Sequence, residues 1–199
     1  MAEQTSDQVL VERVQGGDRR AFDVLVLKYQ QRILKLIMRL VRNSADAEDV
    51  AQEAFIRAYR ALPSFRGDSA FYTWLYRIGI NTAKNHLVSA QRRPFDQEFD
   101  PQDPDNYQIN ARFRDEETPE GLALQEELRV TVERAIAALP DDLRTAIMLR
   151  EIDGLSYEQI AQAMDCPVGT VRSRIFRARE AVDRSIDQLN GVGEQAGRK

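Results

Sequence analysis

Residues 166–180, CPVGTVRSRIFRARE, hold four arginines and a single acidic residue, although the whole chain has a formal net charge of −4. On a helical wheel, one face of this segment is apolar and carries Val171, Ile175, Ala178 and Val182. The opposite face carries Arg172, Ser173, Phe176 and Arg177. In the major groove of DNA, arginine can bond bidentately to guanine, serine can bond to a phosphate or a base edge, and phenylalanine can contact a thymine methyl. This face therefore predicts a helix that reads base edges.

The residues before this helix predict a helix-turn-helix at about 157–176. A short helix with an apolar face precedes the tight turn DCPVG, and a new helix is expected to start at Thr170. Ala161 is small enough for two helices to pack closely, and Val171 can fill the angle between them. Asp165 stands where such turns usually have glycine, and aspartate tolerates the left-handed conformation better than most residues.

Two other interpretations of the arginine segment stay open from the residues alone. It can be a charged surface helix whose Phe176 packs on a neighbouring element. It can also be an amphipathic helix that binds a membrane surface or a protein partner, although the preceding helix and turn weaken this interpretation.

The rest of the sequence offers little for covalent or metal chemistry. It contains one cysteine, Cys166, which excludes an internal disulfide and a multi-cysteine zinc site, and one histidine, His86. It has no Ser/His/Asp set, Walker loop or GxGxxG motif. We interpret His86 as a surface or capping residue and expect no catalytic residue, metal or cofactor. No run approaches about 18 apolar residues and the N-terminus lacks a secretory pattern, so we expect a cytoplasmic protein.

Charge divides the chain into three parts. Residues 1–93 hold 15 Lys/Arg and 10 Asp/Glu (net +5), residues 94–127 hold 2 and 11 (net −9), and residues 128–199 hold 11 of each. The middle part is rich in proline and has little apolar periodicity, so it cannot bury enough surface to offset its ordering entropy. We therefore expect an acidic, mostly irregular linker between two domains, with a loop folded against one domain as the alternative.

The domains on either side of this linker are predicted to be helical. Apolar residues recur at helical spacing in the segments 18–41, 44–62, 70–93, 122–139 and 141–154. Ser44 is the expected N-cap of the second helix, and Pro63 ends that helix. No segment has strand-like alternation, so the sequence predicts an all-α protein with two small domains.

Aromatic residues gather in the third of these helices. Phe71, Leu75 and Ile78 share a stripe that is typical of a core. Tyr72 and Tyr76 share another face, and aromatic faces next to basic residues suit unstacked bases. The helix is therefore expected to serve both the core and a nucleic-acid surface.

Two long stretches resemble a known family. LREIDGLSYEQIAQAMDCPVGTVRSRIFRAREAVD resembles the fourth conserved region of bacterial RNA polymerase sigma factors, and DAEDVAQEAFIRAYRALPSFRGDSAFYTWLYRIGINTAKNHL resembles their second region. With an acidic linker between them, the order resembles the extracytoplasmic-function class, close to its gamma-proteobacterial envelope-stress and alginate-controlling type. The resemblance covers about 5–93 and 120–187. It implies region 2 at 1–93, a linker at 94–121, region 4 at 122–190 and a disordered tail at 191–199.

The resemblance also implies site residues. The helix 46–62 matches the one that docks on a coiled coil of the polymerase clamp, and the matching residues are Asp49, Gln52, Glu53 and Phe55. The loop 65–69, FRGDS, matches one that forms a pocket for a base flipped out of the opened non-template strand. The residues implied to bind this downstream promoter element are Phe65, Asp68, Ser69, Trp74, Tyr76, Asn81 and Lys84.

Two candidate functions follow. The first is a sigma factor that binds core RNA polymerase and promoter DNA, as duplex and as opened strand, and directs initiation in an envelope or extracytoplasmic stress regulon without covalent chemistry of its own. The second is a free-standing helix-turn-helix regulator. The first is favoured because the N-terminal domain has an acidic helix followed by an aromatic-rich basic helix, where a regulator would need a sensor or dimerisation domain. The resemblance further implies a membrane-anchored anti-sigma factor as a partner, with no insertion of this chain into the membrane.

Overall fold

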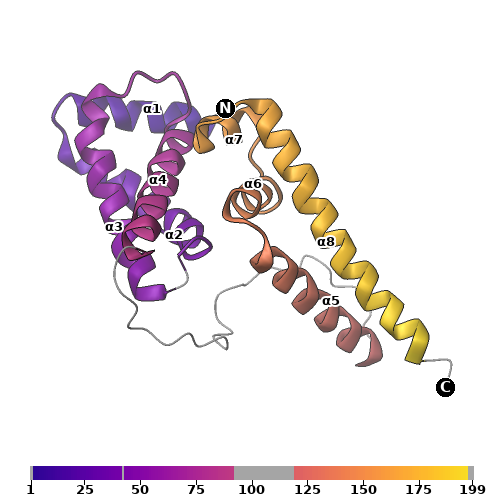
Figure 1. The fold of residues 1–199 in the computed structure, drawn as a ribbon. Helices are drawn as coiled ribbons and strands as arrows, with labels where there is room; N and C mark the ends of the chain where they lie inside the picture. Colours follow the sequence, from indigo (N-terminus) through magenta and orange to yellow (C-terminus); the bar gives the residue numbers. More distant parts are fainter. Residues whose placement is uncertain (1, 42, 92–118, 197–199) are drawn as a thin grey trace. The chain divides into compact units, whose positions relative to one another are not determined.

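The structure, a computed structural model, describes residues 2–41, 43–91 and 119–196 (Figure 1). Every regular element in these ranges is a helix, which confirms the predicted all-α class. The elements in chain order are α1 (Ala2–Gln15), α2 (Arg19–Met38), α3 (Ser44–Ala61), the 3-10 helix η1 (Leu62–Ser64), α4 (Phe71–Gln91), α5 (Pro119–Ala138), α6 (Asp141–Glu151), α7 (Tyr157–Met164) and α8 (Val168–Ala196). The linker expected at 94–121 lies outside the described residues, apart from 119–121, where α5 has already begun.

The helices form two compact units. One comprises Met1–Pro101 with Glu158–Cys166, and the other comprises Gln102–Tyr157 with Pro167–Lys199. Most of α7 therefore groups with the first unit, whereas the sequence analysis assigns this helix to the second domain. The domain boundaries at 93 and 122 stay predictions.

The core of the first unit lies where α2, α3 and α4 meet. An apolar stripe along α3 and at its end is buried, and consists of Ala47, Val50, Ala54, Ala58 and Leu62. Its alanines are small, so neighbouring helices can approach closely and larger side chains of α2 fill the space between them. These side chains are Leu25, Tyr29, Ile33, Leu36 and Ile37, each at most 2% exposed.

Helix α4 buries a wider face than its predicted stripe. Phe71 and Leu75 are buried as predicted, but Ile78 is only half-buried. Ile80 and Ala83 are fully buried instead. The reason is that α4 packs against both α2 and α3, so more than one row of its side chains faces the core.

Helix α1 is not predicted from the sequence, because this helix docks partly through a polar residue. Asp7 is buried, and its carboxylate accepts a hydrogen bond from Lys28 Nζ at 2.7 Å and another from the Tyr29 hydroxyl. A buried carboxylate is stable only when it is paired and hydrogen-bonded. A polar contact of this kind adds no apolar residue to the periodic pattern from which helices are predicted.

The N-cap of α3 is Asn43, so the prediction of Ser44 is wrong by one residue. The Asn43 Oδ1 accepts hydrogen bonds from the backbone N–H groups of Ala45 at 2.9 Å and Asp46 at 3.2 Å. The backbone of Asn43 is extended, whereas Ser44 is already helical, and a capping side chain must come from the residue before the first helical one.

The core of the second unit lies where α5, α6 and α8 meet, with α5 running alongside α8 (Figure 1). It consists of Ile136, Leu139, Ile147, Met148 and Ala178, and Val132, Leu143, Ala181 and Val182 pack against it. The buried Arg144 guanidinium donates to the Ala137 carbonyl at 3.2 Å and to the Asp141 carboxylate, which ties α6 to the end of α5. The expected disordered tail differs from the structure, because α8 continues as helix to Ala196.

Candidate nucleic-acid interface

Helix α8 has the two faces that its sequence predicts, although it begins at Val168 rather than Thr170. Val171, Ile175 and Ala178 are buried, at most 2% exposed. The predicted reading face is exposed and carries Arg172, Ser173, Phe176 and Arg177. Phe176 is 64% exposed, so its ring does not pack into the domain as the surface-helix interpretation requires.

The four arginines in residues 166–180 fall into two pairs. Arg174 donates to the Asp142 carboxylate at 2.6 Å, and Arg179 donates to the Glu151 carboxylate at 2.6 Å. The hydrogen bond to Glu151 also raises the pKa of Arg179. Both of these arginines hold α8 on α6. Arg172 and Arg177 belong to the exposed face, and the Arg172 guanidinium lies 5.8 Å from the centre of the Tyr157 ring.

The turn before α8 has the predicted backbone. Asp165 has φ +54°, which confirms the left-handed conformation expected where such turns usually carry glycine. The backbone N–H of Cys166 donates to the Ala161 carbonyl at 3.0 Å, so the end of α7 is closed by a backbone hydrogen bond. At the start of α8, the Ser173 hydroxyl donates to the Thr170 carbonyl at 2.9 Å. This bond uses the hydroxyl proton and leaves the oxygen of Ser173 as an acceptor.

The loop 65–69 in the first unit has an anchored start and an exposed tip. The Phe65 ring lies 4.9 Å from the Trp74 ring and 6.3 Å from the Phe71 ring, measured between centres. Gly67 has φ +78°, a conformation that glycine adopts without strain. Asp68 is exposed, so a carboxylate is available at the tip.

The other residues predicted for the downstream element are not equally accessible. Asn81 is exposed, and Ser69, Trp74 and Lys84 are half-buried. Tyr76 is only 3% exposed and its ring packs edge-on against Tyr72, with 6.4 Å between centres. Tyr76 therefore offers no face to a base in this structure. Its helical position next to Tyr72 is as predicted, but helical periodicity could not show that the ring is covered.

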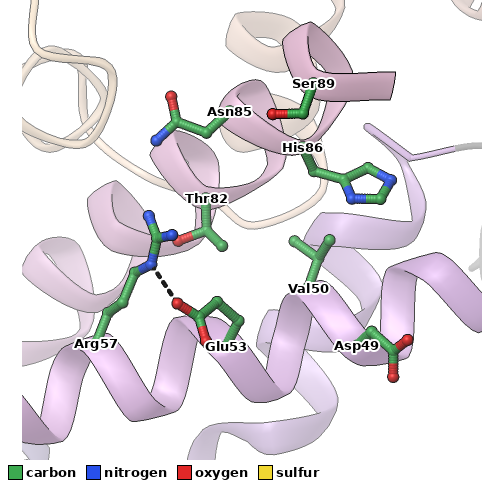
Figure 2. Close-up of a pocket in the computed structure, with 8 residues that line it drawn as sticks. All are labelled: Asp49, Val50, Glu53, Arg57, Thr82, Asn85, His86 and Ser89. Carbon is green, nitrogen blue, oxygen red and sulfur yellow. Dashed lines mark hydrogen bonds and ion pairs between the residues drawn. The ribbon is translucent and has the colours of Figure 1, made fainter. Parts of the chain in front are cut away.

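The residues predicted to bind polymerase lie along α3. Asp49 and Gln52 are exposed, and Glu53 and Phe55 are half-buried. Asp49 and Glu53 also line a groove between α3 and α4 (Figure 2). Its volume is about 300 Å³, and its lining residues are Asp49, Val50, Glu53, Arg57, Thr82, Asn85, His86 and Ser89.

The charges of this groove come from both helices. Arg57 donates to the Glu53 carboxylate at 2.7 Å, as Figure 2 shows. His86 Nε2 lies 3.5 Å from the carboxylate of Asp46 and is 32% exposed, which agrees with the interpretation of His86 as a surface residue. Arg57 is not among the residues predicted from the sequence, although its spacing of four residues from Glu53 is a signal for this ion pair. Carboxylates on successive turns of an exposed face can pair with basic groups of a partner protein.

Two kinds of site are absent from the described part of the chain. Residues 2–41, 43–91 and 119–196 contain no group of three or more His, Cys, Asp or Glu side chains that could hold a metal ion. Within the same ranges, no helix has the length and apolar character needed to cross a membrane.

Comparisons with known proteins agree with this arrangement. Residues 25–93 match Sigma-70 region 2, and residues 129–182 match Sigma-70, region 4. The chain is 61% identical to the RNA polymerase sigma-H factor of Pseudomonas aeruginosa and 60% identical to the ECF RNA polymerase sigma-E factor of Escherichia coli K12. Each alignment covers 95% of this chain and 98% of the relative.

A solved structure adds a likeness of fold. The sigma factor RpoE from Bartonella quintana, in a co-crystal with the anti-sigma factor NepR, superimposes with a TM-score of 0.60 at 26% identity. The match covers 83% of this chain and 96% of the other. Two matched sigma regions in this order, together with relatives that align along nearly the whole length, show that the chain belongs to the extracytoplasmic-function class of the sigma-70 family of RNA polymerase sigma factors.

Proposed function

We propose that the chain binds core RNA polymerase through α3, reads the upstream promoter element with α8, and receives an unpaired base of the opened downstream element at the loop 65–69. As a sigma factor, it is a transcription initiation factor and not an enzyme. The genes that it serves form an envelope or extracytoplasmic stress regulon, and it acts in the cytoplasm.

The observation that carries this proposal is the exposed face of α8. A single exposed apolar side chain is ordinary on a protein surface, but Phe176, which is 64% exposed, shares its face with the exposed Arg172 and Arg177, and this combination is what points to a nucleic acid. It suits the major groove, where the ring can contact a thymine methyl and the arginines can bond to guanine. Arg174 and Arg179 are engaged with acidic residues of α6, so we assign base reading to Arg172 and Arg177 rather than to this second pair.

Two kinds of protein partner follow from the sigma-factor assignment. Asp49 and Glu53 on α3 present carboxylates on successive turns to basic groups of the polymerase clamp, and Phe55 adds an apolar contact. An anti-sigma factor, anchored at the inner membrane, holds the chain inactive until the stress arrives. The co-crystal of the Bartonella quintana relative with NepR supports this part of the proposal by analogy.

The test is run-off transcription by core polymerase from a promoter that the wild-type chain activates. Phe176→Ala should lower promoter affinity by on the order of 1–3 kcal/mol, as for loss of a base contact. The free energy of unfolding should be unchanged, because the ring is exposed. Leu128→Ala is the matched control, since Leu128 is an apolar residue of the same unit and is 40% exposed.

Three outcomes would contradict the proposal. Failure of the wild-type chain to support initiation at any promoter would refute the role in initiation. A large loss of stability in Phe176→Ala, with normal promoter affinity of the folded fraction, would assign Phe176 to packing. Promoter binding by the wild-type chain alone, as a dimer and without stimulation by core polymerase, would favour the free-standing regulator.

A further inference from the structure

The side chain of Gln15 joins the end of α1 to both ends of the segment that leads into the loop 65–69. Its Nε2 donates to the Leu62 carbonyl at 3.0 Å and to the Phe65 carbonyl at 2.9 Å. We propose that Gln15 is a positioning residue that sets the base specificity of this loop, an inference that rests on the proposed role of the loop. The residue does not touch DNA and acts through the backbone of Phe65.

The two hydrogen bonds bring donors to two backbone carbonyls at the end of a helix, one of which also has a backbone donor. The last carbonyls of a helix have no intrahelical donor, and Pro63 has no N–H to supply one. The Ala61 carbonyl accepts from the Ser64 hydroxyl at 2.8 Å. The Leu62 carbonyl accepts from the backbone N–H of Phe65 at 3.1 Å as well as from Gln15, and the Phe65 carbonyl accepts from Gln15. Both Gln15 protons come from another helix. Because both acceptors are carbonyl oxygens, only the NH₂ end of the amide can face them.

The bond to Phe65 fixes the direction in which the loop leaves the helix. The Phe65 carbonyl belongs to the peptide plane between residues 65 and 66, and a planar peptide turns as one body. The Phe65 ring is held separately, against Trp74 and Phe71. With the ring and the carbonyl both held, the exposed residues Gly67 and Asp68 start from a defined orientation. Loss of the bond from Gln15 would release the Phe65 carbonyl, while the ring and the backbone N–H of Phe65, which donates to the Leu62 carbonyl at 3.1 Å, would stay held.

Helix α1 is itself held firmly enough to carry this bond. Near its start, the buried Asp7 accepts hydrogen bonds from Lys28 and Tyr29 of α2. Near its end, Arg13 donates to the Asp18 carboxylate at 2.6 Å. Asp7 ties α1 to α2, and the bond from Arg13 to Asp18 spans Gln15 in the chain, so the Gln15 amide is presented by a helix that is held in place. The base specificity of the loop depends on this support, because a binding site whose residues are loosely held discriminates poorly between ligands.

The test compares Gln15→Glu and Gln15→Met with Gln30→Glu in holoenzyme made from the full chain and core polymerase. Glutamate has the same shape but no donor, and its charge would face two carbonyls; methionine has a similar length and no donor or charge. Gln30 lies exposed on α2, so Gln30→Glu makes the same charge change away from the loop. The probes are partly single-stranded promoter DNAs with each of the four bases at each position of the opened non-template strand.

We expect both Gln15 variants to prefer the best base at one position of the opened strand at least about fivefold less strongly than the wild-type chain does. This factor is the lower limit of the loss in affinity that one mismatched base causes. Affinity for core polymerase and binding to duplex that carries only the upstream element should equal those of Gln30→Glu. Gln15→Lys, whose ammonium group can donate to both carbonyls, should restore part of the preference. If Gln15 had only a structural role, its replacement would lower the free energy of unfolding without a selective loss of base preference.

The outcomes separate this inference from the function on which it rests. If wild-type holoenzyme shows no base preference anywhere in the opened strand, the proposed role of the loop is wrong. If wild type discriminates and both folded Gln15 variants discriminate equally well, the loop keeps its role and the inference about Gln15 is refuted.

Discussion

Replacement of Tyr29 by phenylalanine should destabilise the first unit more than its small chemical change suggests. The Tyr29 ring is 1% exposed and its hydroxyl donates to the carboxylate of Asp7, which is 3% exposed. Tyr29→Phe keeps the ring and removes this hydrogen bond. The buried Asp7 carboxylate then keeps its hydrogen bond from Lys28 but loses the one from the Tyr29 hydroxyl. Hydrogen bonds to charged groups contribute about 1.5–3 kcal/mol, and the loss should lie in this range.

The assay is urea unfolding of the full chain, followed by the fluorescence of Trp74. This is the only tryptophan and it belongs to the first unit, so the signal reports that unit alone. The slope of the free energy of unfolding against urea should not change, because the variant exposes no additional surface on unfolding. The midpoint should fall.

Tyr59→Phe is the matched control. Tyr59 is 39% exposed, so removal of its hydroxyl should change the free energy of unfolding by no more than about 0.5 kcal/mol. In an Asp7→Ala background, Tyr29→Phe should cost much less, since its partner is already absent. Equal losses for Tyr29→Phe and Tyr59→Phe, or an unchanged cost in the Asp7→Ala background, would refute the reasoning.

Two further predictions use the same fluorescence. Asn43→Ala should destabilise the first unit by about 1 kcal/mol, because it removes the cap of α3, whereas Ser44→Ala should have little effect; the reverse order would restore Ser44 as the cap. The hydrogen bond from Arg13 holds the pKa of the Asp18 carboxyl below its ordinary value, so its contribution to stability is present above about pH 4 and is lost as the pH falls through the pKa of the folded state. Asp18→Asn should therefore differ most from wild type near neutral pH, and the two unfolding curves should converge in acid; a constant difference at every pH would exclude this origin.

The faces of α8 could be predicted from the sequence because they depend on one helix alone. Once residues 168–182 are helical, the spacing of Val171, Ile175 and Ala178 places Phe176 on the opposite side, whatever surrounds the domain. The left-handed backbone of Asp165 was predictable for the same reason, since it is a property of one residue type in a tight turn.

Only the tertiary structure decided how accessible the aromatic residues of α4 are and how the loop 65–69 is anchored. Helical periodicity places Tyr76 beside Tyr72, but burial of its ring depends on what packs over that face. The amide of Gln15 meets carbonyls that are 47 and 50 residues away in the chain. A glutamine at the end of a polar helix has no pattern that marks it, because the value of its hydrogen bonds comes from two backbone carbonyls that only folding brings within its reach.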